Sequence, residues 1–422
     1  MLKRAIVCSL IMSIVATCLG CSSILEGDTR SESPHTAVSN ERPQEARIEV
    51  SNYEELKARI LDFVMRHEGQ GLMVVHRYGG DVETDVDRAI DEIMSDNPRA
   101  VYAVAEIDGI VTRIVSYFEI DINIEYKRTK EQLESIIAVS NLRYLRTELL
   151  RIMSEYREEA VFLTSLQVTE MDMVGFVIET YYENPRNIVI MPITVVETFT
   201  TNGNERLIEL RFRYIAEADM MRQYGASLTG SVRRNVLVAE GENDAEILLS
   251  LVVNLIGASN FDEATARTIS EHGVQNLAAT AHNALVTGSA VGEGFAMAFK
   301  ALCDELGLDC RVVLGYLNGM VHAWNIVSLF GDYYHIDVAM SALNGVETAF
   351  LKADVDFNEI YTWDTENTER CIGTLTYEDI VGTGDDEDNE EDDEQHDGTD
   401  AEISDDPDNG ADAGTSGVSD EV

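Results

Sequence analysis

Apolar residues recur at helical spacing directly after residue 47 and then give way to short apolar runs. In Val50–Val64 (VSNYEELKARILDFV) the apolar positions fall three or four residues apart, which predicts an amphipathic helix. The run GLMVVHRY predicts a strand, and DVDRAIDEIM predicts a second helix that stops at Asn97-Pro98. Proline disfavours helical backbone at the residue before it. Two further strands complete this first unit.

The same pattern occurs a second time. The segment VSNLRYLRTELLRIM (residues 139–153) resembles the opening helix, and YENPRNIVIM (residues 182–191) resembles SDNPRAVYAV (residues 95–104). Two closing strands are predicted over NIVIMPITVVETF and RLIELRFRYI, joined by the hairpin signal Asn202-Gly203-Asn204. We therefore predict two tandem α/β repeat modules, over residues 48–138 and 139–238, with a structural or partner-docking role.

From Asn243 onward the pattern becomes helical and then strand-like. NDAEILLSLVVNLIGAS has an acidic start suited to a helix N-terminus, and a helix beginning near Ala290 has core spacing. Its predicted core positions are Phe295, Phe299, Leu302 and Leu306. The strands RVVLGYL, AWNIVSLF and DYYHIDVAM follow, separated by turns at Asn318-Gly319 and Gly331-Asp332. Helices followed by an antiparallel sheet predict an α+β domain, which we place at residues 239–382.

The negative charge of the chain limits the classes of partner that it can bind. The formal net charge is −46, and residues 385–422 contribute 18 acidic residues without lysine or arginine. We predict that residues 383–422 form a disordered acidic tail, because they cannot bury enough apolar surface to offset ordering. The rest of the chain keeps a charge of −28, which disfavours nucleic acid as a partner. Calcium binding by the tail is an alternative role that rests on composition alone. No spacing of Cys and His indicates a metal site, and no cofactor is expected.

The N-terminus is typical of an export signal. Lys3 and Arg4 precede the apolar run AIVCSLIMSIVATCLG, which is too short for a membrane span. It ends at Gly20-Cys21, and a polar segment follows. This arrangement resembles the lipobox of bacterial lipoproteins, although Cys18 stands where that motif usually has leucine. The resemblance implies a signal peptide at residues 1–21, lipidation of Cys21, a polar tether at residues 22–47 and anchoring to the outer face of the membrane. The alternative is an ordinary signal peptide and a secreted protein.

Candidate chemistry lies in the third region. A thiol acyl-transferase needs a cysteine at a helix N-terminus, a histidine base and a polar group that orients the histidine. His322 begins a predicted strand and Asp337 ends the next one, so a tight turn between the strands would set the two side by side. His335 is predicted to pack in the core. The alternative is that His322 has only a structural role and is hydrogen-bonded to Asp337.

Residues from about Asn243 to Cys371 resemble the transglutaminase-like superfamily, in particular its exported bacterial branch. The resemblance rests on Gly292-Glu293-Gly294-Phe295, on His322-Ala323-Trp324-Asn325 and on Tyr334-His335-Ile336-Asp337. It implies a papain-like fold in which a helix packs on a small antiparallel sheet, with His322 as base and Asp337 as its orienting partner. Glu293, Trp324 and Asn325 would belong to the cleft. At the position of the nucleophilic cysteine stands Gly292, and Val338-Ala339-Met340 departs from the family's usual Pro-Thr-Trp.

These residues lead us to expect a cell-surface protein that is catalytically inactive and binds a peptide or protein partner, such as a cell-wall peptide, in a degenerate thiol-enzyme cleft. The alternative is an active cysteine peptidase or acyl-transferase, an activity expected in close relatives that keep the cysteine. Cys303 and Cys310 are too far along the chain to replace the missing nucleophile. The sequence leaves two possibilities for Cys303, Cys310 and Cys371: a disulfide between Cys310 and Cys371, or three buried free thiols.

Overall fold

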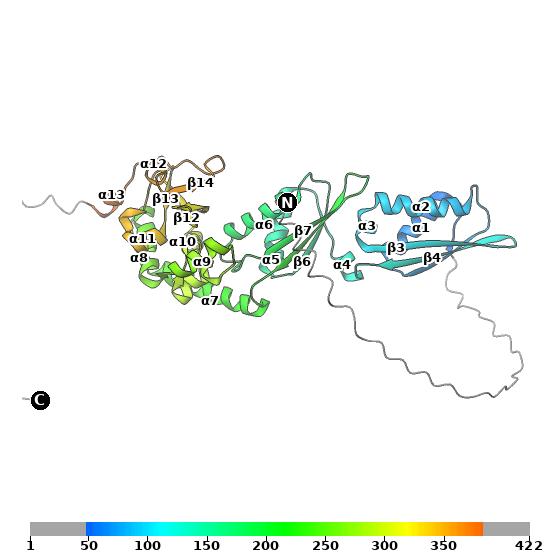
Figure 1. Ribbon diagram of the computed structural model, residues 1–422, viewed down its shortest axis with the longest axis horizontal. Coiled ribbons are helices and arrows are strands. Elements are labelled where there is room, and N and C mark those ends of the chain that lie inside the picture. Colours follow the sequence, from blue (N-terminus) through cyan, green and yellow to red (C-terminus); the bar gives the residue numbers. More distant parts are fainter. Residues whose placement is uncertain (1–47, 383–422) are drawn as a thin grey trace, which may run out of the picture.

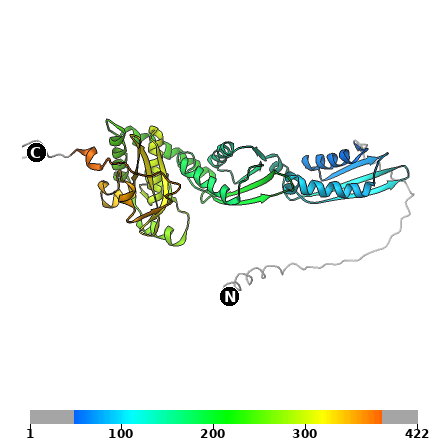
Figure 2. The ribbon, with the colours of Figure 1, turned by 90° about the horizontal axis from the view of Figure 1, so that it is seen from above.

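The computed structural model describes residues 48–382, which form three bodies in succession along one axis (Figure 1, Figure 2). The first two bodies each contain a four-stranded sheet, and the third holds the largest number of helices. The predicted signal peptide (1–21) with Cys21, the tether (22–47) and the acidic tail (383–422) lie outside the described residues. Within residues 48–382 no helix has both the length and the apolar character needed to cross a bilayer.

The first body has the strand order β1-β2-β4-β3, in which β1 and β2 are parallel and the other pairs antiparallel. Its strands are β1 (Ile48–Glu49), β2 (Gln70–Val75), β3 (Val104–Ile114) and β4 (Tyr117–Tyr126). Helices α1 (Tyr53–Met65) and α2 (Val82–Asp96) pack on the sheet and on each other, with Leu56, Ile60 and Ile93 in the shared core. Asn97-Pro98 does end α2, but a further short helix, α3 (Pro98–Ala103), begins at the proline.

The second body has the same strand order, β5-β6-β8-β7, again with only the first pair parallel. Its elements are α4 (Lys130–Glu134), β5 (Ile137–Val139), α5 (Leu142–Ser154), β6 (Glu159–Thr164), α6 (Glu170–Glu183), β7 (Ile193–Phe199) and β8 (Arg206–Arg213). The strand predicted from Asn187 begins only at Ile193. The hairpin through Asn202-Gly203-Asn204 joins β7 to β8 as predicted.

The repeated Val-Ser-Asn triplet has a clear local role. Asn52 caps α1 by accepting a hydrogen bond from the backbone N–H of Glu55, and Asn141 caps α5 in the same way through Tyr144. Asparagine is favoured at this position because its side chain satisfies an N–H group that has no partner inside the helix. The triplet therefore marks the strand-to-helix transition in both bodies.

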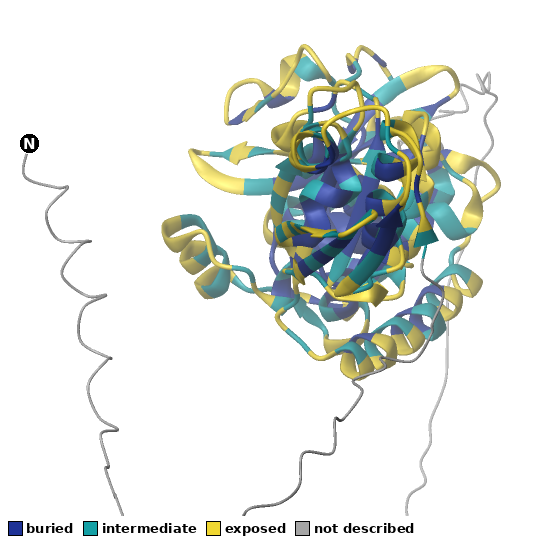
Figure 3. Ribbon diagram, turned by 90° about the vertical axis from the view of Figure 1, so that its right-hand side faces the viewer, coloured by how far each residue is buried: buried dark blue, intermediate teal, exposed yellow. Residues whose placement is uncertain are grey.

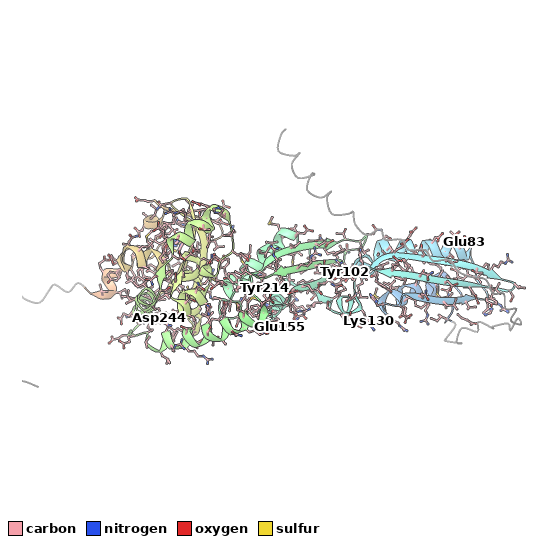
Figure 4. The ribbon with its side chains drawn as sticks, turned by 60° about the horizontal axis from the view of Figure 1, so that its bottom comes forward. Glu83, Tyr102, Lys130, Glu155, Tyr214 and Asp244 are labelled. Atoms are coloured by element: carbon pink, nitrogen blue, oxygen red, sulfur yellow. The ribbon has the colours of Figure 1, made fainter. Side chains whose placement is uncertain are left out.

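Tyr102 fixes the junction between the first two bodies (Figure 4). Its hydroxyl donates to Glu209 on β8 over 3.0 Å, and Arg128 donates to the other oxygen of the same carboxylate over 2.9 Å. Glu209 is buried, and Tyr102 also packs against Val161 and Leu207 of the second sheet. A buried carboxylate needs such donors to offset its lost hydration, so this junction specifies one geometry.

The third body places helices on a four-stranded antiparallel sheet and also contains a short two-stranded parallel sheet, which confirms the α+β class. Its sheet has the order β13-β12-β11-β14 and consists of β11 (Cys310–Leu317), β12 (Met320–Leu329), β13 (Asp332–Ile336) and β14 (Tyr361–Trp363). Its longer helices are α7 (Ala218–Leu237), α8 (Asp244–Ala258), α9 (Glu263–His272) and α10 (Gly292–Leu306). Its shorter elements are β9 (Asn260–Phe261), η1 (Leu277–Ala279), η2 (Asn283–Thr287), β10 (Ser289–Ala290), α11 (Val338–Asn344), η3 (Val346–Thr348), α12 (Asp354–Phe357) and α13 (Tyr377–Val381).

Helix α10 is the centre of this body. It packs against β12, β11, α7, α8 and α11, and ten of its fifteen residues are buried. Seen along the long axis from the end of the first body, buried residues lie toward the centre of the protein and exposed residues toward its edge (Figure 3). Phe295, Phe299 and Leu302 are fully buried as predicted, whereas Leu306 is 38% exposed because it is the last residue before the Gly307 cap. Helix α7, which the predicted boundaries place in the second module, contacts α10 and is tied to Leu285 by a hydrogen bond from Ser231.

Two tight turns set the register of the sheet. Asn318 and Gly319 both have positive φ, so the β11–β12 hairpin has the two-residue turn predicted for it. The second turn is shifted by one residue from the prediction: Phe330 and Gly331 have positive φ, and Asp332 already pairs with Leu329 in β13. The right-handed twist of the strands favours such turns even where phenylalanine must adopt a left-handed conformation.

The three cysteines of the described residues are free and buried. Of the two possibilities left open by the sequence, the Cys310–Cys371 disulfide is therefore not formed, and the structure has three buried free thiols. Burial raises the pKa of the Cys371 thiol to about 12, and burial together with the neighbouring Cys310 raises the pKa of Cys303 well above its usual value. Such thiols are poor nucleophiles because the thiolate is the reactive form.

Candidate functional site

Gly292 and His322 meet where α10 crosses β12. Gly292 is the first residue of α10 and is buried, and His322 lies on β12 opposite Gly315 of β11. A Cβ atom built on Gly292 would lie closer than 3.0 Å to both Nδ1 and Cε1 of His322, and 3.3 Å from the carbonyl oxygen of Ala323. Real Cβ atoms essentially never show contacts below 3.0 Å. The imidazole therefore occupies the space that a side chain at residue 292 would need.

His322 is held from its other side by Asp337. The distance from His322 Nε2 to Asp337 Oδ2 is 2.6 Å, and Tyr361 donates its hydroxyl hydrogen to the same oxygen over 2.8 Å. The backbone N–H of Met340 donates to Oδ1, because Asp337 is also the N-cap of α11. The contact with Asp337 favours the tautomer that carries its proton on Nε2, so that Nδ1 is an acceptor facing Gly292.

The environment keeps the Asp337 carboxyl ionised. Burial works to raise its pKa, but the adjacent His322 and the hydrogen bonds from His322, Met340 and Tyr361 outweigh burial, and the pKa is lowered. Asp337 is only 1% exposed, so this carboxylate depends on those partners rather than on water. The predicted pair of His322 and Asp337 is thus a direct, buried contact.

Trp324 and Asn325, which the family resemblance assigns to the cleft, are fully buried. Trp324 donates its indole N–H to Nδ1 of His335, and its ring packs among Tyr361, Phe357 and Trp363. Asn325 donates to the carbonyl oxygens of Ala296 and Arg311 and so ties β12 to α10. Neither side chain is exposed to a ligand. Their role in this structure is to fix the position of the strand that carries His322.

His335 belongs to the core behind the site. It is fully buried, accepts at Nδ1 from Trp324 and contacts Asp354 through Nε2 over 3.0 Å. Together with Cys371 these residues bring three potential metal-ligand atoms within 4.8 Å of one another. Because Trp324 already donates to Nδ1, the Nε2 atom carries the imidazole proton and has no free lone pair for a metal ion. Packing is therefore the role that the geometry supports for His335, in agreement with its predicted role.

Glu293, the third predicted cleft residue, points toward the second body. Its Oε1 atom accepts a hydrogen bond of 2.8 Å from the hydroxyl of Tyr182 at the end of α6. Burial raises the pKa of the Glu293 carboxyl to about 7, although that hydrogen bond acts in the opposite direction. Tyr182 was not singled out from the sequence, since no local pattern connects residues that are 111 positions apart.

A pocket of about 220 Å³ lies between the second body and the third, with Glu293 in its wall. Helix α6, the segment before β7, the end of α9 and β12 all contribute to its lining. Gln275 spans the two bodies by donating from Nε2 to the carbonyl oxygen of Met191 over 3.0 Å, and its buried Oε1 has no hydrogen-bond partner among residues 48–382. Two residues that line the pocket are sequence neighbours of the His322 site: Val321 precedes His322, and Glu293 follows Gly292.

The family model described as the transglutaminase-like superfamily matches residues 257–338. The match contains Gly292, His322 and Asp337 and extends from the end of α8 to the first residue of α11. No curated protein matches the chain.

Three solved structures are similar to parts of the chain. A transglutaminase structure has 12% identity and a TM-score of 0.25, over 53% of this chain and 65% of the other. A candidate cysteine protease from Cytophaga hutchinsonii has 15% identity and a TM-score of 0.22, over 38% and 66%. An arylamine N-acetyltransferase from Bacillus cereus, with a Cys-His-Glu triad, has 13% identity and a TM-score of 0.21, over 27% and 49%. The chain spans less than two thirds of the length of each.

Proposed function

We propose, from the match of residues 257–338 to the transglutaminase-like superfamily, that the chain is a catalytically inactive protein of this kind that binds a peptide or protein partner. The observation that carries the proposal is the contact between residue 292 and His322. Gly292 has no side chain, and the His322 ring fills the space beside its α-carbon. A thiol enzyme would need a sulfur atom there to attack the acyl group and hold it covalently.

None of the other thiols of the described residues replaces that sulfur. Cys303 lies eleven residues further along α10, which corresponds to about 16 Å at the usual helical rise, and is completely buried. Cys310 and Cys371 are buried as well. On this proposal His322 and Asp337 correspond to a base and its orienting partner, and no thiol among residues 48–382 serves them as a nucleophile.

Because this arrangement has no thiol nucleophile among the described residues, we assign it a binding function and no catalytic one. The pocket is lined by Glu293 and Val321, the sequence neighbours of Gly292 and His322, and has both an apolar lining and hydrogen-bonding groups, as binding pockets generally do. An extended peptide, a cell-wall stem peptide included, is the partner class that we assign to it. The net charge of −46 makes nucleic acid an unsuitable partner.

For location we propose export and lipid anchoring through Cys21, with secretion as the alternative. Support comes from the basic start, the apolar run and the Gly20-Cys21 sequence. Lipidation that supplies more than one acyl chain would hold the protein stably at the membrane. Labelling of producing cells with an alkyne fatty acid should tag the wild type and not Cys21→Ser. Equal labelling of both proteins would contradict the anchor.

The experiment for the central proposal has two parts. The purified protein is assayed for amine incorporation into a glutamine-containing protein and for peptide hydrolysis, before and after iodoacetamide. We expect no activity that iodoacetamide removes. It is then presented to an array of immobilised peptides that includes stem peptides, and we expect a subset to bind. Activity that alkylation abolishes, or an array without any bound peptide, would contradict the proposal.

An active thiol peptidase or acyl-transferase remains the second candidate, for close relatives that carry cysteine at this position. The intact contacts among His322, Asp337 and Tyr361 favour it, because a catalytic histidine needs such an orienting partner. Replacement of Gly292 by cysteine tests this candidate directly and is taken up below.

A further inference from the structure

Helix α10 runs along β12 in a fixed register. Its first residue, Gly292, lies against His322 and the carbonyl oxygen of Ala323, and the carbonyl oxygen of Ala296 accepts a hydrogen bond of 3.0 Å from Asn325. Four helical residues rise about 6 Å and two strand residues about 7 Å, so helix and strand advance together between these contacts. The end of α10 therefore lies beside the end of β12.

The same register brings Cys303 level with the start of β11. Cys303 lies seven residues beyond Ala296, about 10 Å at the helical rise, which corresponds to about three residues beyond Asn325 on β12. Cys310, the first residue of β11, pairs with Val327 of β12 at about that level. Eleven residues are close to three full helical turns, so Cys303 leaves α10 on the same side as the position beside His322.

Both side chains enter the same core. Cys303 is completely buried and Cys310 is 3% exposed, and both belong to one hydrophobic cluster with Val327. The Cys310 thiol also adds to the raised pKa of Cys303 through a hydrogen bond, which requires the two sulfur atoms to be neighbours. The chain between them turns sharply, because α10 ends at the left-handed Gly307 and Leu308 donates its N–H to the carbonyl oxygen of Cys303 over 3.0 Å.

The third thiol is on the other side of the sheet. Cys371 belongs to a separate core cluster with Trp324 and Ile326 of β12. Successive side chains of a strand point to opposite faces, so residues 324 and 326 face away from the side that Val327 shares with α10. The sheet separates Cys371 from Cys310, and among residues 48–382 only Cys303 and Cys310 are placed to bond.

We propose that Cys303 and Cys310 form a disulfide bond in the exported protein. The inference rests on the proposed export, because thiols in the cytosol stay reduced. The bond joins the end of α10 to the start of β11 and closes the short loop through Gly307. It restricts the unfolded chain and so stabilises the helix whose first residue meets His322.

The oxidant is another disulfide, either a small molecule such as oxidised glutathione or a protein disulfide. The thiolate of one cysteine attacks it, forms a mixed disulfide and releases the first thiolate of the oxidant. The other cysteine then attacks the sulfur of the first, so that their S–S bond forms and the second thiolate leaves. The two protons of the cysteine thiols pass to the released thiolates. Because both thiols are buried in the folded protein, the bond forms during folding, before α10 and β11 have packed.

Refolding tests the pair in the full chain. The reduced protein is refolded from urea with oxidised and reduced glutathione, its free thiols are blocked with iodoacetamide in urea, and it is digested with trypsin. Lys300 and Arg311 flank both cysteines, so residues 301–311 form one peptide. We expect this peptide to carry no alkyl group and to be lighter by the mass of two hydrogen atoms. An alkylated peptide, or one joined to the peptide that contains Cys371, would overturn the proposal.

Variants and unfolding curves test the role of the bond. Cys371→Ala should leave the modified peptide unchanged, and Cys303→Ala should abolish it. The oxidised wild type should unfold at a higher urea concentration than the same protein after reduction. In Cys303→Ala, reduction should not shift the midpoint. A wild type whose midpoint does not rise on oxidation would contradict a bond that stabilises the junction of α10 and β11.

Protein taken from producing cells, with its thiols blocked at lysis, separates this inference from the export proposal. If the alkyne fatty acid tags the protein and its peptide 301–311 lacks the bond, the inference fails and export stands. If refolding yields the bond but the protein in cells is untagged and reduced, export fails and the pairing of the two cysteines stands.

Discussion

The imidazole of His322 lies directly against the α-carbon of Gly292, in the space where any larger residue would place its Cβ atom. Two features hold the ring there: the short contact with Asp337 and the packing of α10 on β12. The glycine is therefore required by the present geometry, since this ring position and a side chain at residue 292 exclude each other.

We expect Gly292→Ala to destabilise the protein by about 1–3 kcal/mol, because the new methyl group overlaps the ring and forces it or α10 to shift. The free energy of unfolding in urea measures this. In a His322→Ala background the cost should fall markedly, since the space is then free. Gly175→Ala is the matched control: Gly175 lies in α6 with nothing near its added Cβ, and alanine there should stabilise by about 0.5–1 kcal/mol. An equal cost of Gly292→Ala in both backgrounds would contradict the overlap.

Gly292→Cys should produce a thiol that iodoacetamide modifies near pH 7 much faster than Cys303, Cys310 or Cys371. The new thiol would lie at the N-terminus of α10 beside an imidazole, and both features favour the thiolate. For the sulfur to fit, His322 must swing away from its present position. Mass spectrometry after timed alkylation identifies the modified residue, and His322→Ala should slow its modification. A thiol that reacts no faster than the three buried cysteines would show that the site no longer accepts a nucleophile.

The sequence predicts the parts of the site that depend on local structure. Asn318-Gly319 sets the β11–β12 register, and the next turn brings Asp337 to the end of β13, so the contact between His322 and Asp337 follows from two short turns. The contacts of Glu293 with Tyr182 and of Gln275 with Met191 could not be predicted. They depend on how the second body packs against α9 and α10, and no periodicity within one element carries that information. The same holds for Tyr361, which reaches Asp337 from an edge strand 24 residues later.

Asp337→Asn should destabilise the protein by roughly 1–3 kcal/mol at neutral pH, because a buried acceptor of three hydrogen bonds loses its charge. The pKa of Asp337 is lowered in the folded state, so its stabilising effect is present above the unfolded pKa and is lost as the pH falls through the folded pKa. The difference between wild type and variant should therefore shrink below about pH 4. Asp332→Asn, at the exposed start of β13, should show neither effect. A difference that stays constant down to pH 2 would contradict the ionised carboxylate.

Glu293→Gln should have the opposite pH dependence. Burial raises the folded-state pKa of Glu293 from 4.5 to about 7, so the carboxyl stabilises the fold fully below pH 4.5 and this contribution is lost as the pH rises through 7. As the pH rises between these values, the free energy of unfolding of the variant should increase by up to about 3 kcal/mol relative to that of the wild type. The reason is that glutamine stays neutral and can still accept the hydrogen bond from Tyr182. Urea unfolding at pH 4, 6 and 8 measures the gain, with Glu271→Gln on the exposed side of α9 as the control. A gain that is the same at all three pH values would mean that the Glu293 carboxyl has the same pKa in the folded and the unfolded protein, as expected if water reached it freely from the pocket.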